Sequence, residues 1–195
     1  MICETEDVLL PRNLTVYLIG FSGCGKTTLA RELAAILRFP FVDTDRLIEQ
    51  RTKMPITEIF ETRGELYFRR LEAKVLKDVA SKVSHGKIVA LGGGAFDSAA
   101  NRRLVQKTGI SVYLSCAVDE LYRRLAALAD RPLLNVKPRP GQTVREARLE
   151  RMRSLLEKRK SYYESADIRY ATTNVDSTTA ARELRDMLRK QYAKD

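Results

Sequence analysis

The feature that most constrains the fold is the segment from Gly20 to Thr27, which reads Gly-Phe-Ser-Gly-Cys-Gly-Lys-Thr and matches the pattern G-x-x-x-x-G-K-[ST]. An apolar run, residues 16–19, precedes it, and an amphipathic pattern from Lys26 to Leu37 follows it. A strand that leads into a glycine loop and then a helix directs backbone N–H groups and the positive helix end toward one point. That point suits a nucleoside triphosphate, with Lys26 reaching the β- and γ-phosphates and the Thr27 hydroxyl binding Mg²⁺. The alternative is a chance match in an ordinary β-turn-α corner, and the Lys-Thr pair and the flanking patterns argue against it.

Short apolar runs alternate with helical patterns along the rest of the chain, which predicts a parallel sheet covered by helices on both faces. We expect strands at residues 15–19, 41–42, 88–91, 110–114 and 168–170. We expect helices at residues 26–37, 45–51, 56–61, 66–83, 99–106, 118–128, 144–163 and 178–192. The predicted fold class is therefore α/β, three layers (α/β/α) with a five-stranded parallel sheet. It forms a single domain, residues 14–195, after a disordered tail, residues 1–13.

The charge of the chain narrows the class of its ligands. The net charge is +10, and residues 102–160 hold 15 Lys or Arg against 6 Asp or Glu. A basic surface suits anionic small molecules or nucleic acid, although a solvated face of amphipathic helices is the simpler interpretation. The sequence shows no zinc-finger spacing and no aromatic-rich RNA-binding pattern. Nucleic acid is therefore not the expected partner.

Membrane and secretion signals are not seen in the sequence. No run approaches the ~20 apolar residues that cross a bilayer, and residues 1–7 are acidic without an apolar signal core. Cys3, Cys24 and Cys116 are odd in number and lack C-x-x-C spacing, which favours a reducing cytoplasm without disulfides or structural zinc. We expect a cytoplasmic protein with no membrane partner. Cys24 is interpreted as a space-filling residue, because a catalytic thiol would need a base and the only histidine, His85, lies in a predicted turn.

One connection differs from a plain turn. Residues 129–141 contain three prolines and three basic residues between two helical patterns. An irregular surface loop is one interpretation. The other is a mobile lid, at about residues 127–142, that closes over phosphates and carries Arg131 to them. Beside a phosphate-binding loop we favour the lid, and the helix after it begins with a capping box formed by Thr143 and Glu146.

Candidate residues for a second ligand follow the second and third predicted strands, where ligands of parallel sheets bind. Asp43 and Asp45 stand at i and i+2 of an extended segment and point the same way. One could serve Mg²⁺ and the other an acceptor hydroxyl, but N-capping of the next helix is the better interpretation of this pair taken alone. Three consecutive glycines, residues 92–94, follow the third strand. They cost backbone entropy and let a ligand approach the main chain.

Taken in chain order, these segments resemble the shikimate kinase family, whose members phosphorylate the 3-hydroxyl of shikimate with ATP. The resemblance extends from about Thr15 to Tyr192. Six segments carry it: GFSGCGKTT at 20–28, FVDTD at 41–45, ETRGE at 61–65 with FRRLE at 68–72, ALGGG at 90–94, RPLL at 131–134 and KRKSYY at 158–163. Each segment alone is a modest signal, whereas the ordered set is specific. The resemblance implies a P-loop kinase fold with a nucleoside-monophosphate-kinase-like or flavodoxin-like core.

For the acceptor, the resemblance implies that Asp45 binds the shikimate hydroxyls and acts as the base. Arg69 and Arg159 are implied to clamp the shikimate carboxylate. A planar guanidinium fork is the group that carboxylate recognition calls for. Three glycines are implied to line the ring of the acceptor: Gly92, Gly93 and Gly94.

For the donor, the resemblance implies that Asp43 belongs to the Mg²⁺ environment, that Arg131 of the lid reaches the transferring phosphates and that Arg124 packs beside the nucleotide. The remaining ATP contacts come from the loop: Gly23, Cys24, Gly25, Lys26, Thr27 and Thr28. Phosphoryl transfer depends on positioning and charge neutralisation, so Asp45, Lys26 and Arg131 are the implied catalytic residues. The family often has a Val-Asp dipeptide near its last strand, before the adenine-binding segment, and Tyr170-Ala171 is taken as its equivalent here.

Other classes of protein fit the sequence less well. Another small-molecule kinase, such as a gluconate or nucleotide kinase, would share the loop and differ in its acceptor. A GTPase would carry an Asn-Lys-x-Asp segment, which this sequence lacks. A catalytically silent binding module would have lost Lys26, Asp45, Arg69 or Arg131, and all four are present. We therefore predict a monomeric shikimate kinase that acts on ATP and shikimate and needs Mg²⁺.

Overall fold

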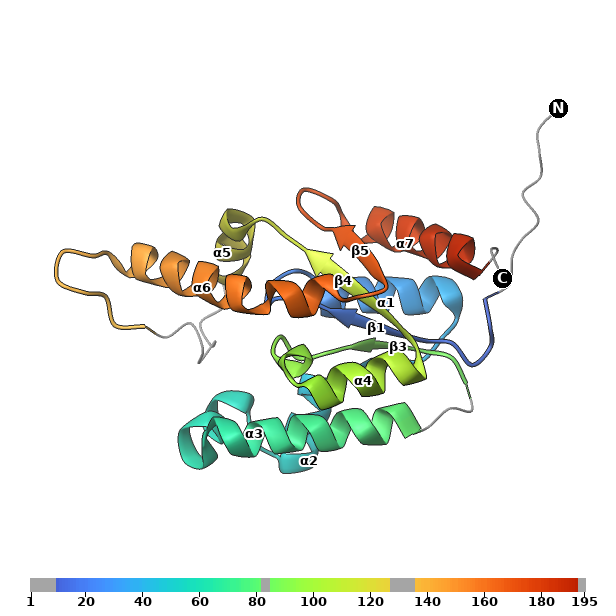
Figure 1. Ribbon diagram of the computed structural model, residues 1–195, viewed down its shortest axis with the longest axis horizontal. Helices are drawn as coiled ribbons and strands as arrows, with labels where there is room; N and C mark the ends of the chain where they lie inside the picture. Colours follow the sequence, from blue (N-terminus) through green and yellow to red (C-terminus); the bar gives the residue numbers. More distant parts are fainter. Residues whose placement is uncertain (1–9, 82–84, 127–135, 193–195) are drawn as a thin grey trace.

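The computed structural model describes residues 10–81, 85–126 and 136–192. Five parallel strands form one sheet in the order β2-β3-β1-β4-β5. Four of them, β3, β1, β4 and β5, are labelled in Figure 1. The strands are β1 (Thr15–Ile19), β2 (Phe41–Asp43), β3 (Lys87–Ala90), β4 (Ile110–Ser115) and β5 (Ile168–Ala171). The predicted five-stranded parallel sheet is confirmed. The flavodoxin-like alternative is wrong, because that core has the strand order 2-1-3-4-5.

Helices cover both faces of the sheet. They are α1 (Lys26–Leu37), α2 (Thr44–Thr52), α3 (Ile56–Ser81), α4 (Ala99–Thr108), α5 (Val118–Ala126), α6 (Val144–Glu164) and α7 (Ser177–Tyr192), with a short 3₁₀ helix, η1 (Ala95–Asp97). Helices α1 and α7 pack together on one side, and α2, α3 and α4 lie on the other (Figure 1). In β1, Val16 and Leu18 face the first group, whereas Tyr17 and Ile19 face the second. Both faces of this central strand are buried, which explains its unbroken apolar run.

Two local features depart from the predicted elements. The helices expected at 56–61 and 66–83 form one element, α3, which breaks at Gly64 (φ 79°, ψ 169°). Only glycine adopts this backbone conformation readily. The predicted interruption is therefore present as a kink at Gly64 within one helical element. The helix η1, directly after the three glycines, was not predicted. The capping box of Thr143 and Glu146 at the start of α6 is confirmed.

The predicted tail and lid lie partly outside the described residues. Residues 1–9 of the tail and residues 127–135 of the lid, including Arg131, are not described. Leu10 packs partly against the core, and the carbonyl of Arg12 accepts a hydrogen bond from the N–H of Gly86. Residues 10–13, at the end of the predicted tail, thus make a backbone hydrogen bond and apolar contacts with the rest of the described chain. In the described part of the lid, Arg139 forms an exposed ion pair with Glu150.

Candidate active site

The phosphate-binding loop joins β1 to α1 in a conformation that requires its glycines. Gly20, Gly23 and Gly25 have φ values of 140°, 84° and 97°, which side-chain-bearing residues rarely adopt. Gly25 is the N-cap of α1, and no side chain among the described residues caps this helix end. The first N–H groups of α1 and the positive end of its dipole therefore meet inside the loop. This arrangement suits a phosphate.

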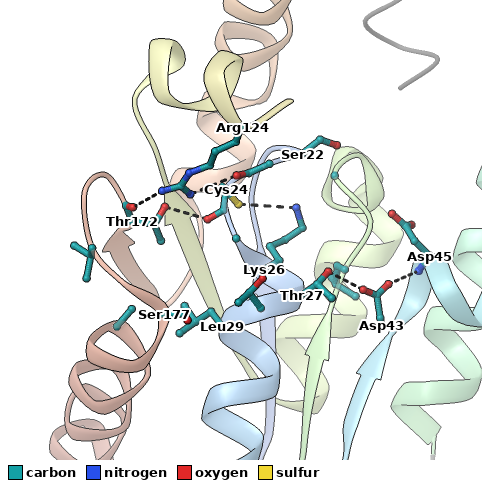
Figure 2. Close-up of a pocket in the computed structure, with 17 residues that line it drawn as sticks. Ser22, Cys24, Lys26, Thr27, Leu29, Asp43, Asp45, Arg124, Thr172 and Ser177 are labelled. Atoms are coloured by element: carbon teal, nitrogen blue, oxygen red, sulfur yellow. Dashed lines mark hydrogen bonds between the residues drawn. The ribbon is translucent and has the colours of Figure 1, made fainter. Parts of the chain in front are cut away.

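Lys26, the first residue of α1, lies back along the loop. Its Nζ donates to the carbonyl oxygens of Gly20 at 2.8 Å and Phe21 at 2.9 Å. The Sγ of Cys24 lies 3.9 Å from the same nitrogen (Figure 2). Burial raises the pKa of the Cys24 thiol, which keeps it protonated and agrees with a space-filling role.

A cavity of about 430 Å³ opens at the carboxyl ends of β1, β2 and β3 (Figure 2). Most of the predicted site residues line it: Gly23, Cys24, Gly25, Lys26, Thr27, Thr28, Asp43, Asp45, Gly93 and Arg124. The predicted residues Gly92, Gly94, Arg69 and Arg159 are not among its lining residues. The loop and Asp45, which are separate in the sequence, thus share one space.

The two carboxylate oxygens of Asp43 have different partners, one in the phosphate-binding loop and one at the start of α2. Its Oδ2 accepts a hydrogen bond from the Thr27 hydroxyl at 2.7 Å. Its Oδ1 accepts from the backbone N–H groups of Asp45 at 3.0 Å and Arg46 at 3.2 Å, which makes Asp43 the N-cap of α2. The cap therefore fixes the carboxylate so that its other oxygen faces the loop. Two oxygen ligands of the kind that Mg²⁺ prefers, from Thr27 and Asp43, stand side by side.

The three glycines leave room for charged side chains of the site. A Cβ on Gly92 would lie 2.5 Å from Asp45 Oδ1 and 2.6 Å from Glu72 Oε1, so both carboxylates face this glycine. A Cβ on Gly94 would lie 2.6 Å from both terminal nitrogens of Arg69. A Cβ on Gly93 would lie 3.1 Å from Ser22 Oγ in the phosphate-binding loop. The three glycines therefore stand where an added Cβ would lie close to polar and charged groups of the protein, and the approach of a ligand to this backbone stays a prediction.

Arg69 is held between two carboxylates of its own helix. Its Nε and Nη2 donate to Glu65 Oε1 at 3.2 and 3.0 Å, and its Nη1 donates to Glu72 Oε2 at 3.0 Å. Burial lowers the pKa of Arg69, but the attraction of these carboxylates outweighs it and leaves that pKa raised. Burial raises the pKa of Glu72 to about 7, because Arg69 only partly offsets desolvation while Asp45 and Asp97 add repulsion.

Arg159 on α6 pairs with Asp97 of η1. Its Nε donates to Asp97 Oδ2 at 3.0 Å, and its Nη2 lies 2.9 Å from the same oxygen. The guanidinium lies over the ring of Phe21, with its carbon 5.9 Å from the ring centroid. One turn further along α6, the Tyr163 hydroxyl donates to the carbonyl of Gly93 at 2.6 Å. Arg69 and Arg159 therefore approach one segment, residues 92–97, from two helices.

Arg124 and Thr172 brace the opposite end of the cavity. Arg124 donates through Nη1 to the carbonyl of Gly23 at 3.4 Å and through Nη2 to the carbonyl of Thr172 at 3.1 Å (Figure 2). The Thr172 hydroxyl donates to the carbonyl of Cys24 at 3.0 Å (Figure 2). The segment after β5 is thereby tied to the phosphate-binding loop. Arg124 thus lies beside the phosphate-binding loop, and its packing beside the nucleotide stays a prediction.

Sequence reasoning missed several residues of this site. Val175, Ser177 and Ala180, which follow β5, line the cavity. A Val-Asp dipeptide, Val175-Asp176, stands in this segment, whereas Tyr170-Ala171 lies inside β5.

Glu72 and Asp97 were also missed as site residues. Glu72 lies in the segment FRRLE, three positions after Arg69 on the same helix, and that spacing brings two side chains together. Asp97 gave no such signal, because its partner Arg159 is 62 positions away.

Within residues 10–81, 85–126 and 136–192, no helix is long and apolar enough to cross a membrane. The same part of the chain contains no group of three or more His, Cys, Asp or Glu that could hold a metal ion.

Comparisons with known sequences agree with the geometry. The sequence profile of the shikimate kinase family matches residues 22–189. The shikimate kinase of Sulfurihydrogenibium sp. is 37% identical over 175 residues, covering 90% of this chain and 96% of that protein. The shikimate kinase of Chlorobium luteolum is 35% identical over 185 residues, covering 95% of this chain and 89% of that protein.

Solved structures give the same result. The shikimate kinase from Acinetobacter baumannii in complex with shikimate superposes with a TM-score of 0.83 at 34% identity, covering 91% of this chain and 94% of that one. A gluconokinase from Sinorhizobium meliloti superposes with a TM-score of 0.57 at 14% identity, covering 95% and 97% of the two chains, and so shares the fold alone. The chain belongs to the shikimate kinase family, whose members are enzymes that phosphorylate shikimate with ATP.

Proposed function

We propose that this enzyme transfers the γ-phosphate of ATP to the 3-hydroxyl of shikimate, with ATP in the phosphate-binding loop and shikimate beside Asp45. One observation carries this division of the site: the cavity lined by residues 23–28 is lined also by Asp45 and Gly93. A phosphate held by the loop and a hydroxyl held by Asp45 would occupy one space. Phosphoryl transfer needs that proximity more than it needs covalent chemistry.

The loop and α1 form the donor half of the proposal. The N–H groups at the start of α1 would bind the phosphates, and Lys26 would exchange its contacts with loop carbonyls for phosphate oxygens. Thr27 and Asp43 would hold Mg²⁺, whose usual environment combines one or two protein oxygens with phosphate oxygens and water. When bound, Mg²⁺ neutralises charge on the phosphates. Arg131, outside the described residues, remains the lid residue predicted to reach them.

Asp45, Arg69 and Arg159 form the acceptor half. Asp45 would accept the proton of the attacking hydroxyl, and the two arginines would bind the shikimate carboxylate. Support comes from the segment 92–97, which Asp45 and Arg69 contact through its glycines and Arg159 contacts through Asp97. A carboxylate at this segment would meet both guanidinium groups and leave the ring hydroxyls on the side of Asp45.

The first test is ADP release by the purified protein with Mg²⁺ and ATP. ADP should appear only when shikimate is added, and a neutral polyol should not replace shikimate. Equal rates with the polyol would remove the reason for an arginine clamp and would favour another small-molecule kinase. Light scattering on the same sample tests the expected monomer.

Asp45→Asn tests the base. The variant keeps the shape of the side chain and removes its charge, so kcat should fall by about 10²-fold or more. Binding of ATP, measured by calorimetry, should stay near the wild-type value. A variant that retains most of its turnover would show that Asp45 binds the acceptor without taking its proton.

Arg69→Ala tests the carboxylate clamp, and Arg70→Ala is its matched control. Arg70 is the next residue of α3 and is exposed. R69A should raise KM for shikimate by about tenfold or more, since a charge-assisted bidentate contact is lost, with little change in KM for ATP. R70A should leave both constants unchanged, and equal losses for the two substrates in R69A would contradict the proposed roles.

A further inference from the structure

We propose that Asp97 competes with the acceptor's carboxylate for Arg159, and that this competition sets the affinity of the site for a carboxylate ligand. The inference rests on the proposed function, in which Arg159 binds a carboxylate. The Nε of Arg159 donates to Asp97 Oδ2 at 3.0 Å, and the Nη2 lies 2.9 Å from the same oxygen. An acidic side chain of the protein thus occupies the guanidinium that the substrate needs.

The exposure of the two carboxylates, Glu72 at Arg69 and Asp97 at Arg159, indicates which of them can release its arginine. The Glu72 side chain at Arg69 is 2% exposed, whereas the Asp97 side chain at Arg159 is 35% exposed. Release of Glu72 would leave a carboxyl group without its partner in the protein interior, at a high cost in desolvation. Asp97 can instead turn toward water, where its charge is solvated. Arg159 is only 8% exposed and stays in place to receive the incoming carboxylate.

The backbone of Asp97 is fixed while its side chain exchanges partners. Its N–H donates to the carbonyl of Gly94 at 3.1 Å, within η1. Arg102 Nη1 donates to the carbonyls of Phe96 at 2.7 Å and Asp97 at 2.9 Å, which holds η1 against α4. Release of Arg159 therefore requires a rotation of one short side chain and no movement of the chain.

This arrangement lowers the affinity of the site for a carboxylate ligand and leaves its affinity for a neutral ligand unaffected. A carboxylate brought by the ligand can replace Asp97 at Arg159, because it offers the same charged acceptor oxygens. A neutral ligand offers weaker hydrogen bonds, so the Arg159–Asp97 pair stays closed and the ligand loses that contact. The cost is a lower affinity for shikimate than the same site would have without the Asp97 charge.

The test compares shikimate with its carboxamide, which lacks the charge, as ligands of the wild type, Asp97→Asn and a control, Asp78→Asn. Asp78 pairs with Arg51 on the α2–α3 surface, away from residues 92–97. Dissociation constants are measured by calorimetry, and kcat by ADP release. D97N should bind shikimate about three- to tenfold more tightly, because a charged competitor becomes a neutral one. Its affinity for the carboxamide should not change, and D78N should match the wild type with both ligands.

Weaker or unchanged shikimate binding in D97N overturns the inference, as does an equal gain for the carboxamide. A wild type that does not bind shikimate overturns the proposed function and the inference with it, whereas wild-type binding with an unchanged D97N overturns only the inference. A crystal structure of the wild type with shikimate decides the question even if D97N does not fold. Arg159 should then contact the ligand and no longer donate to Asp97, and a retained pair would contradict the competition.

Discussion

Replacing Glu72 with glutamine should change how the stability of the protein depends on pH. The Glu72 side chain is almost completely buried. Among the described residues, only one of its two carboxylate oxygens has a hydrogen-bond partner, the Nη1 of Arg69. Desolvation therefore raises its pKa to about 7 despite Arg69, and the charges of Asp45 and Asp97 add to the shift. Glutamine keeps the shape and an acceptor for Arg69, and it removes the ionisation.

The sign and size of the effect follow from this pKa. Folded Glu72 keeps its proton to about pH 7, whereas the unfolded chain releases it near the ordinary value of 4.5. The folded state therefore binds more protons between these values, and its stability declines as pH rises through them. Each pKa unit corresponds to about 1.4 kcal/mol, so ionising Glu72 costs the folded protein about 3 kcal/mol at high pH. Most of this cost develops between about pH 5 and about pH 8.

Urea unfolding at a series of pH values measures this difference. The unfolding free energy of E72Q minus that of the wild type should rise by about 2–3 kcal/mol from about pH 5 to about pH 8. Glu65→Gln is the matched control, because it removes the other, half-exposed carboxylate from Arg69 and keeps Glu72, so it should retain the wild-type decline. Parallel curves for E72Q and the wild type would refute the reasoning. They would mean that Arg69 outweighs burial and keeps Glu72 ionised.

Two further variants test the backbone of α3 and the bracing of the loop. Gly64→Ala should lower the unfolding free energy, measured in urea, by about 1–3 kcal/mol, because φ 79° and ψ 169° suit only glycine. No atom lies within 4 Å of the added Cβ, so the loss would come from the backbone alone. A loss near zero would mean that α3 straightens without strain. Thr172→Val should cost about 1–2 kcal/mol, because a buried hydroxyl that bonds the carbonyls of Cys24 and Ser115 is lost. The same variant should raise KM for ATP and leave KM for shikimate unchanged, and equal increases would contradict a role confined to the donor side.

Local patterns predicted the elements well because local physics determines them. The start of α1 at Lys26 follows from the glycine before it, and the start of α6 follows from the capping box of Thr143 and Glu146. The strand order could not be predicted in this way. The pairing of β1 with β3 and β4 depends on which helices pack across the sheet, and an alternating pattern of apolar runs is compatible with more than one order.

The residues of the site were predictable to the extent that they carry a pattern in the sequence. Asp43 and Asp45 could be placed at a strand end, but the double use of Asp43, as a helix cap and as a partner of Thr27, needs the fold. Asp97 lies in a turn of 3₁₀ helix without a periodic signal, and its ion pair joins two distant segments. Long-range charge pairs leave no spacing that a single sequence can reveal.

The segment from Gly92 to Asp97 explains why three glycines stand together where one would serve a turn. Each glycine removes a Cβ from a different neighbour: Asp45 and Glu72 at Gly92, the phosphate-binding loop at Gly93, and Arg69 at Gly94. The carbonyl of Gly93 is at the same time held by the Tyr163 hydroxyl, whose burial raises its pKa and keeps it a donor. The spacing between the phosphate-binding loop, the proposed base and the proposed carboxylate clamp therefore depends on one short segment of backbone, residues 92–97. A side chain at any of the three glycines would therefore move two parts of the site relative to each other.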